Sequence, residues 1–145
     1  MPVSVTAMII EDEKDLCYLL KLVLKQNNLQ PACAYSITEA KENIQKIKPA
    51  IVFLDNHLPD GYGSDFISTV KELNPKAKII MITAYDSPSD IDIAFKQGAD
   101  YFISKPFNAQ KVKNAINKVR ANRAYEIYLG SWRQFPMMYM SSFKI

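Results

Sequence analysis

The chain has 145 residues, enough for one domain with a full hydrophobic core. Its net charge of +3 at pH 7 is small, so the composition predicts no general affinity for nucleic acids or membranes. No apolar stretch is long enough to span a bilayer, and no basic start precedes the first apolar run as in a signal peptide, so we expect a cytoplasmic protein.

Strand-like and helix-like stretches alternate five times along the chain. In order, they cover residues 3–10 (strand), 15–27 (helix), 30–35 (strand), 37–47 (helix), 51–54 (strand), 64–73 (helix), 78–82 (strand), 88–97 (helix), 101–103 (strand) and 108–123 (helix). Ser36, with Glu39 three residues later, fits a capping box for the second helix. Ser87 followed by Pro88 starts the fourth helix, and Gly98 closes it. This alternation predicts an α/β fold, a doubly wound five-stranded parallel sheet with helices on both faces.

Two cysteines, Cys17 and Cys33, fall in the first expected helix and the second expected strand. Both lie in apolar-periodic segments, and their spacing does not match a metal-ligand set. We therefore expect buried, reduced thiols.

The run from Ile51 to Leu54 is apolar without interruption and ends in Asp55. Such a run is typical of a strand that is covered on both faces, as in a parallel sheet. Ligands of open α/β sheets bind at the carboxyl ends of the strands, which is where Asp55 lies. The next helix begins too far along the chain for Asp55 to cap it, so we interpret Asp55 as a site residue.

Polar side chains follow four of the five expected strands and should meet at one edge of the sheet: Glu11, Asp12, Asp55, Thr83 and Lys105. Three carboxylates in one cleft repel one another unless a cation joins them. Oxygen ligands without a cluster of His or Cys favour a hard cation, and we predict Mg²⁺. The cation, the ammonium and the hydroxyl together would bind a phosphoryl group, and Asp55 is the expected nucleophile.

These motifs resemble those of a known family. The acidic pair Glu11-Asp12, the turn Asp55–Gly61, Thr83-Ala84, Tyr101 and Lys105-Pro106-Phe107 are similar to the receiver domain of two-component response regulators, over about residues 6–123. The resemblance implies a flavodoxin-like, receiver-type fold. It also implies that the chain catalyses its own phosphorylation and dephosphorylation, although it acts mainly as a signalling switch.

The resemblance further implies a role for each residue around the acceptor. Asp55 would receive a phosphoryl group from the phosphohistidine of a histidine kinase or phosphotransfer protein. Asp12, Asp55 and the backbone carbonyl of His57 would bind Mg²⁺, with Glu11 acting through a metal-bound water. Lys105 would contact the phosphoryl group.

The remaining implied roles concern the switch. The Thr83 hydroxyl and the Ala84 amide would complete the phosphoryl cradle, and Tyr101 would turn inward once Thr83 moves toward the phosphate. The face made by the fourth helix, fifth strand and fifth helix would change its interactions and is the candidate surface for a homodimer. The Lys105–Pro106 bond is expected to be cis, and the side chains of His57 and Tyr85 would hinder attack by water.

Three other functions fit an α/β domain of this size. A flavodoxin-like FMN carrier would need a hydroxyl- and glycine-rich loop where this chain has Glu11-Asp12-Glu13. A phosphatase with an aspartate nucleophile would have an Asp-x-Asp pattern at these positions, instead of Glu11-Asp12-Glu13. A phosphorylation-independent, receiver-like interaction module is the main alternative, although every pocket residue is present.

Residues 124–145 differ from the receiver-like residues 1–123. They are rich in aromatic residues and methionine, and we expect either an extension that packs on this domain or on a second copy, or a truncated linker. Gly130 is expected to end any continuation of the fifth helix. The segment is too short for a DNA-binding domain, so we predict no direct binding of nucleic acid by it and either a stand-alone receiver or a piece of a longer regulator.

Overall fold

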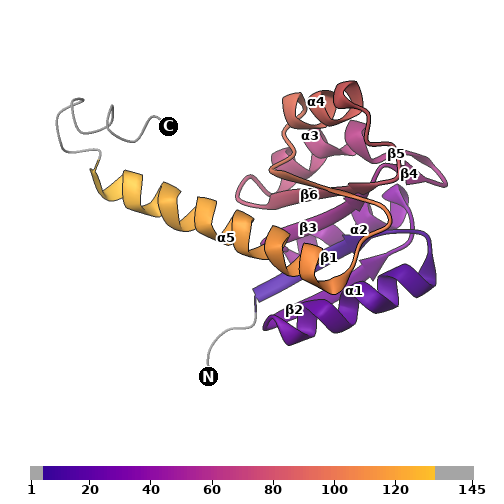
Figure 1. Ribbon diagram of the computed structural model, residues 1–145, viewed down its shortest axis with the longest axis horizontal. Coiled ribbons are helices and arrows are strands. Elements are labelled where there is room, and N and C mark those ends of the chain that lie inside the picture. The colour runs from indigo at the N-terminus through magenta and orange to yellow at the C-terminus, as the bar shows by residue number, and fades with distance from the viewer. Residues whose placement is uncertain (1–4, 133–145) are drawn as a thin grey trace.

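A five-stranded parallel sheet forms the centre of the computed structural model, which describes residues 5–132 and the side chains of residues 5–121 (Figure 1). The strands are β1 (Val5–Ile10), β2 (Leu29–Ala34), β3 (Ile51–Asp55), β6 (Lys78–Thr83) and β7 (Tyr101–Ser104). They lie in the order β2-β1-β3-β6-β7, and every neighbouring pair is parallel. The predicted fold class is confirmed.

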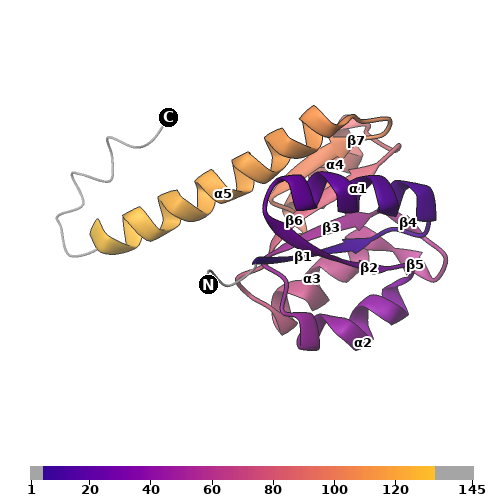
Figure 2. The same cartoon turned by 90° about the horizontal axis from the view of Figure 1, so that it is seen from below.

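Helices cover both faces of the sheet: α1 (Lys14–Gln26), α2 (Ile37–Ile47), α3 (Gly63–Leu73), α4 (Pro88–Lys96) and α5 (Ala109–Trp132). Buried side chains of α1 and α5 form one core with Ile51 and Phe53, and those of α2, α3 and α4 form a second core with Val52 and Leu54. Figure 2 shows α1 and α5 on one side of the strands and α2 and α3 on the other. Because alternate residues of β3 point to opposite faces, both sets are buried, which explains its unbroken apolar run.

The predicted caps set the starts of two helices. The Glu39 amide donates a hydrogen bond to Ser36 Oγ (3.1 Å), and the Glu39 carboxylate accepts one from the Tyr35 amide (3.0 Å). The Asp90 amide likewise donates to Ser87 Oγ (3.2 Å) at the start of α4. The bonds to Ser36 and Ser87 satisfy amides that the first helical turn leaves without an intrahelical partner.

Two features of the backbone differ from the prediction. The turn after Asp55 contains a small antiparallel hairpin, β4 (His57–Leu58) and β5 (Gly61–Tyr62). α5 ends at Trp132 rather than at Arg123, and its last part extends away from the sheet (Figure 1). The expectation that Gly130 stops the helix was wrong, because one glycine weakens a helix by only about 1 kcal/mol. The predicted packing concerns residues 124–145, whose side chains lie outside the described part of the structure.

Length alone does not make α5 a membrane helix. Within residues 5–132, neither α5 nor any other helix combines the length and hydrophobicity that a bilayer span requires.

The expectation of two buried, reduced thiols was wrong in two respects. Cys17 is buried but Cys33 is only partly buried, and the two form a disulfide that joins α1 to β2, with a Cα–Cα distance of 6.7 Å. The sequence separates the two residues by 16 positions. Their contact arises because α1 packs against the β1–β2 side of the sheet, a tertiary relation that cysteine spacing does not show.

Candidate functional site

The carboxyl ends of β1, β3, β6 and β7 bring the five predicted polar side chains to one edge of the sheet. Glu11 and Asp12 follow β1, Asp55 ends β3, Thr83 ends β6, and Lys105 follows β7. Carboxylate oxygens of Glu11, Asp12 and Asp55 all lie within 4.8 Å of one another. The structure therefore assembles the cluster from segments that are distant in sequence, as expected for a parallel sheet.

Lys105 reaches into this cluster. Its Nζ atom lies 3.5 Å from Asp55 Oδ2 and 3.1 Å from Glu11 Oε2. Its backbone amide donates a hydrogen bond to the Thr83 carbonyl (2.8 Å), which fixes the segment beside β6. The Lys105–Pro106 bond is cis, as expected.

The cluster contains more negative charge than Lys105 can balance. Burial, and after it the nearby Asp55 carboxylate, raise the pKa of Glu11 to about 7 although Lys105 lowers it. Burial also raises the pKa of Asp55, although Lys105 opposes this shift. For Lys105, burial would lower the pKa, but attraction to Asp55 and Glu11 outweighs burial, and the pKa rises. An additional cation would relieve this imbalance.

The donor set fits a hard divalent cation. Three carboxylates and one ammonium leave a net charge of −2 when all are ionised. Glu11 Oε2 is buried and accepts no hydrogen bond from the described residues, although Lys105 Nζ lies 3.1 Å away. A buried oxygen without a hydrogen-bond donor is destabilised unless another positive group approaches it. The site therefore suits a cation that prefers oxygen ligands.

The raised pKa of Glu11 predicts how stability depends on pH when divalent cations are removed. A carboxyl group whose pKa rises from 4.5 to about 7 on folding contributes stability below pH 4.5 that is lost as the pH rises through 7. We expect the urea midpoint of the protein in EDTA to be higher at pH 5.5 than at pH 8. Glu11→Gln, which cannot ionise, should flatten this dependence. If the urea midpoint changed equally with pH in the wild type and in Glu11→Gln, the raised pKa of Glu11 would be contradicted.

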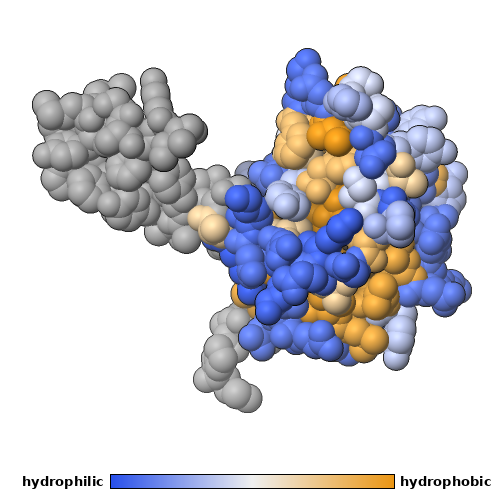
Figure 3. Space-filling model, in the orientation of Figure 1, coloured by the Kyte–Doolittle hydropathy of each residue, from blue (hydrophilic) through white to orange (hydrophobic). Residues whose placement is uncertain are grey.

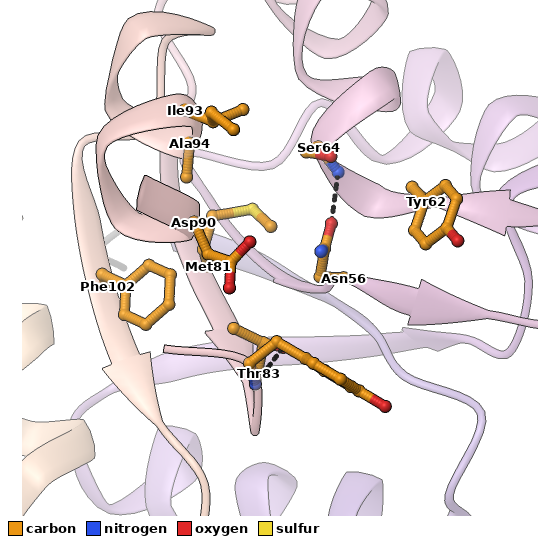
Figure 4. A pocket seen from close by; sticks show the side chains of 10 residues that line it. Asn56, Tyr62, Ser64, Met81, Thr83, Asp90, Ile93, Ala94 and Phe102 are labelled. Atoms are coloured by element: carbon orange, nitrogen blue, oxygen red, sulfur yellow. Dashed lines mark hydrogen bonds between the residues drawn. The ribbon is translucent and has the colours of Figure 1, made fainter. Parts of the chain in front are cut away.

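The loop after Asp55 is fixed at its base by Asn56. The Gly63 amide donates to the Asn56 carbonyl (2.9 Å), and the Ser64 amide donates to Asn56 Oδ1 (2.9 Å; Figure 4). The His57 amide makes a long hydrogen bond to Asp55 Oδ1 (3.4 Å). Sequence reasoning assigned no role to Asn56 or Gly63, because Asn56 Oδ1 accepts from an amide eight residues along the chain, beyond the range of a local helix cap.

An exposed aromatic group lies beside Asp55. The ring of His57 stacks on Tyr85, with 4.0 Å between centroids, and is nearly perpendicular to the ring of Tyr62, with 5.4 Å between centroids. Tyr85 comes two residues after Thr83, and His57 two residues after Asp55, so the stack links the ends of β3 and β6. Ala84, the predicted source of a cradle amide, is exposed at the end of β6.

Thr83 is buried and lines a cavity of about 210 Å³ between β6, β7 and α4. Its Oγ1 atom accepts a hydrogen bond from the Tyr85 amide (3.0 Å), which leaves the hydroxyl proton free to be donated. Phe102 lines the same cavity (Figure 4), whereas Tyr101 packs into the core formed with α1 and α5. Thr83 pairs with Ser104, two residues from Phe102, so Thr83 and Phe102 share one face of the sheet and Tyr101 lies on the other.

Known proteins resemble this chain in sequence and in structure. The response regulator receiver domain model matches residues 7–117. The response regulator protein PilR of Pseudomonas aeruginosa is 31% identical over 110 residues, which are 76% of this chain and 25% of PilR. The chain thus spans about a quarter of the length of that relative.

Solved structures share the fold. A CheY-like response regulator receiver domain protein from Methanospirillum hungatei has a TM-score of 0.79 at 23% identity, covering 86% of this chain and 99% of that chain. A response regulator protein from Burkholderia pseudomallei has a TM-score of 0.73 at 26% identity, covering 84% of this chain and 74% of that chain. The latter crystal structure contains a phosphorylated aspartic acid, a calcium ion and citrate.

Proposed function

The chain belongs to the response regulator receiver domain family, and we propose that Asp55 is the residue that accepts the phosphoryl group. The observation that carries the proposal is the position of the Asp55 carboxylate, buried beside Lys105 Nζ and within reach of two further carboxylates. Such a carboxylate has the charge and the surroundings of a phosphoryl acceptor.

The donor is a phosphohistidine of a histidine kinase or phosphotransfer protein, the partners of this family. An Asp55 carboxylate oxygen attacks phosphorus, an O–P bond forms, and the P–N bond breaks with its electron pair going to the imidazole. Lys105 offsets the negative charge on the phosphoryl oxygens. Hydrolysis of the aspartyl phosphate resets the site, and the stacked rings of His57 and Tyr85 limit the approach of water.

Mg²⁺ is the proposed cation. Asp12 and Asp55 would hold it together with the His57 carbonyl, and Glu11 would bind one of its waters. When bound, the ion supplies positive charge to the transferring phosphoryl group. The crystal structure of the Burkholderia pseudomallei relative contains both a phosphorylated aspartic acid and a calcium ion, which supports a hard divalent cation at this site.

The proposed switch pairs Thr83 with Phe102 instead of Tyr101. The Thr83 hydroxyl and the Ala84 amide bind the phosphoryl group, and movement of Thr83 changes the cavity that Phe102 lines. The affected surface belongs to α4, β7 and α5, where Ile93 and Phe95 of α4 are exposed, and it is the proposed homodimer face. We propose that this chain does not bind nucleic acid directly.

The phosphodonor protein is proposed to contact α1, which follows the Glu11-Asp12 loop. Three large hydrophobic side chains of α1 are exposed: Tyr18, Leu19 and Leu22. Hydrophobic surface is visible along this helix in Figure 3. An exposed apolar strip next to the acceptor suits docking of a phosphodonor protein. We propose that the two proteins meet in the cytoplasm.

Phosphorylation of the whole chain tests the proposal. Incubation with acetyl phosphate and Mg²⁺ should raise the intact mass by one phosphoryl group, and peptide mapping should place it on Asp55. Asp55→Asn, which keeps the shape of the side chain, should remove the gain, and EDTA should suppress it. A phosphorylation-independent module would show no gain in the wild type, and an undiminished gain in Asp55→Asn would refute the assignment.

A further inference from the structure

The tip of the hairpin after Asp55 is bonded to the start of α2. Pro59 and Asp60 form the two-residue turn between β4 and β5. The Asp60 carboxylate accepts hydrogen bonds from the Ile37 amide (2.9 Å), the Thr38 amide (2.8 Å) and the Thr38 hydroxyl (2.7 Å). The bonds from Thr38 and Ile37 lower the pKa of Asp60 to about 2, so the anchor is ionised throughout the physiological pH range.

The other end of the same hairpin touches the acceptor. His57, the first residue of β4, follows Asn56 and donates its amide to Asp55 Oδ1 (3.4 Å). The base is tied to the start of α3 through the Asn56 carbonyl and side chain. The hairpin is therefore fixed at its base by α3 and at its tip by α2, with His57 between the two attachments.

We infer that Asp60 is a positioning residue for the divalent cation of the acceptor site. By fixing the hairpin tip to α2, Asp60 restricts the hairpin that carries the His57 carbonyl, which is a proposed ligand. The inference rests on the proposed function, since it assigns Asp60 to the same metal site. Mutation of a residue that orients a metal ligand from outside the coordination shell commonly lowers metal affinity by about 10–100-fold.

Capping of α2 alone does not account for this arrangement. Ser36 already accepts the Glu39 amide at the helix start. The amides that Asp60 binds belong to an exposed turn, where water can satisfy such groups. Asp60 comes 22 residues after Thr38, so its bonds constrain the relation between two segments rather than one helix. Gly61 tightens this contact, because a Cβ there would lie 3.0 Å from Ile37 Cδ1.

The test compares three variants of the full chain at 0.15 M salt. Asp60→Ala removes the anchor. Ser36→Ala removes a cap from the same helix without touching the hairpin, and Asp65→Ala removes an equal charge from the first turn of α3. Mg²⁺ titrations followed by backbone amide shifts of Asn56 and His57 give the affinity, urea unfolding gives the stability, and the rate with acetyl phosphate is measured against Mg²⁺ concentration.

Asp60→Ala should weaken Mg²⁺ binding by about tenfold, with a higher Mg²⁺ requirement for phosphorylation and a similar rate at saturating Mg²⁺. Ser36→Ala should lower stability and leave Mg²⁺ affinity unchanged, and Asp65→Ala should change the affinity less than twofold. Equal Mg²⁺ affinity in Asp60→Ala and the wild type would overturn the inference, as would equal losses in Asp60→Ala and Asp65→Ala. A wild type that neither binds Mg²⁺ nor gains a phosphoryl group would overturn the proposed function instead.

Discussion

Replacing Gly63 by alanine should destabilise the protein by about 3 kcal/mol or more. Gly63 is buried at the first position of α3, and its amide donates to the Asn56 carbonyl. A Cβ atom at this position would collide with the backbone oxygen of Asp55 and lie 3.0 Å from Leu54 Cγ. A rotamer change cannot relieve a collision with backbone, so β3 and α3 would have to separate at Asp55 itself.

Gly61→Ala is the matched control for this prediction. It inserts the same methyl group two residues away, where the φ angle of +155° also favours glycine, but the obstacle is the end of the Ile37 side chain, 3.0 Å away. That side chain can move, so the loss of unfolding free energy should be clearly smaller than for Gly63→Ala. If urea unfolding ranks the two variants in the opposite order, or finds Gly63→Ala within about 1 kcal/mol of the wild type, the proposed collision is wrong.

The cluster of polar side chains around Asp55 was predictable because its residues follow strands. Apolar runs before Glu11, Asp55 and Thr83 identified three buried strands, and parallel strands end at one edge. The position of Lys105 followed from the same rule, and its contacts with Glu11 and Asp55 agree with it. The fold could therefore be predicted from hydrophobic periodicity and caps, which are local properties of the sequence.

Features that depend on packing could not be predicted in this way. Tyr101 and Phe102 are adjacent aromatic residues of one strand, and their faces were determined only by the pairing of β7 with β6. The disulfide depends on the contact between α1 and β2, and the closeness of Gly63 to Asp55 depends on how α3 docks on β3. The role of Asp60 at α2 likewise joins segments that no local pattern connects.

Replacing Lys105 by methionine should slow phosphorylation of Asp55 by about 100-fold or more at saturating Mg²⁺ and acetyl phosphate. The Lys105 side chain is only 18% exposed, and its Nζ atom lies 3.1 Å from Glu11 and 3.5 Å from Asp55. Methionine fills a similar volume without charge, so the variant isolates the ammonium group. The rate should be measured from the gain in intact mass with time.

The same substitution should lower stability in EDTA at pH 8, by about 2 kcal/mol, because it leaves two buried carboxylates without their cation. The loss should shrink at pH 5.5, where the raised pKa of Glu11 lets that group take up a proton. Unfolding in urea at the two pH values measures both effects. A pH-independent loss would point to altered packing rather than to missing charge.

Adding Glu11→Gln to Lys105→Met separates the two roles of the ammonium. The second substitution removes one of the stranded carboxylates, so stability at pH 8 should return toward that of the wild type. Phosphorylation should stay slow, since the positive charge beside the attacked phosphorus is still missing. Glu11→Gln should therefore restore the stability of Lys105→Met at pH 8 without restoring its rate of phosphorylation. If both recover together, Lys105 serves only to balance Glu11, and the charge that assists phosphoryl transfer comes from elsewhere in the site.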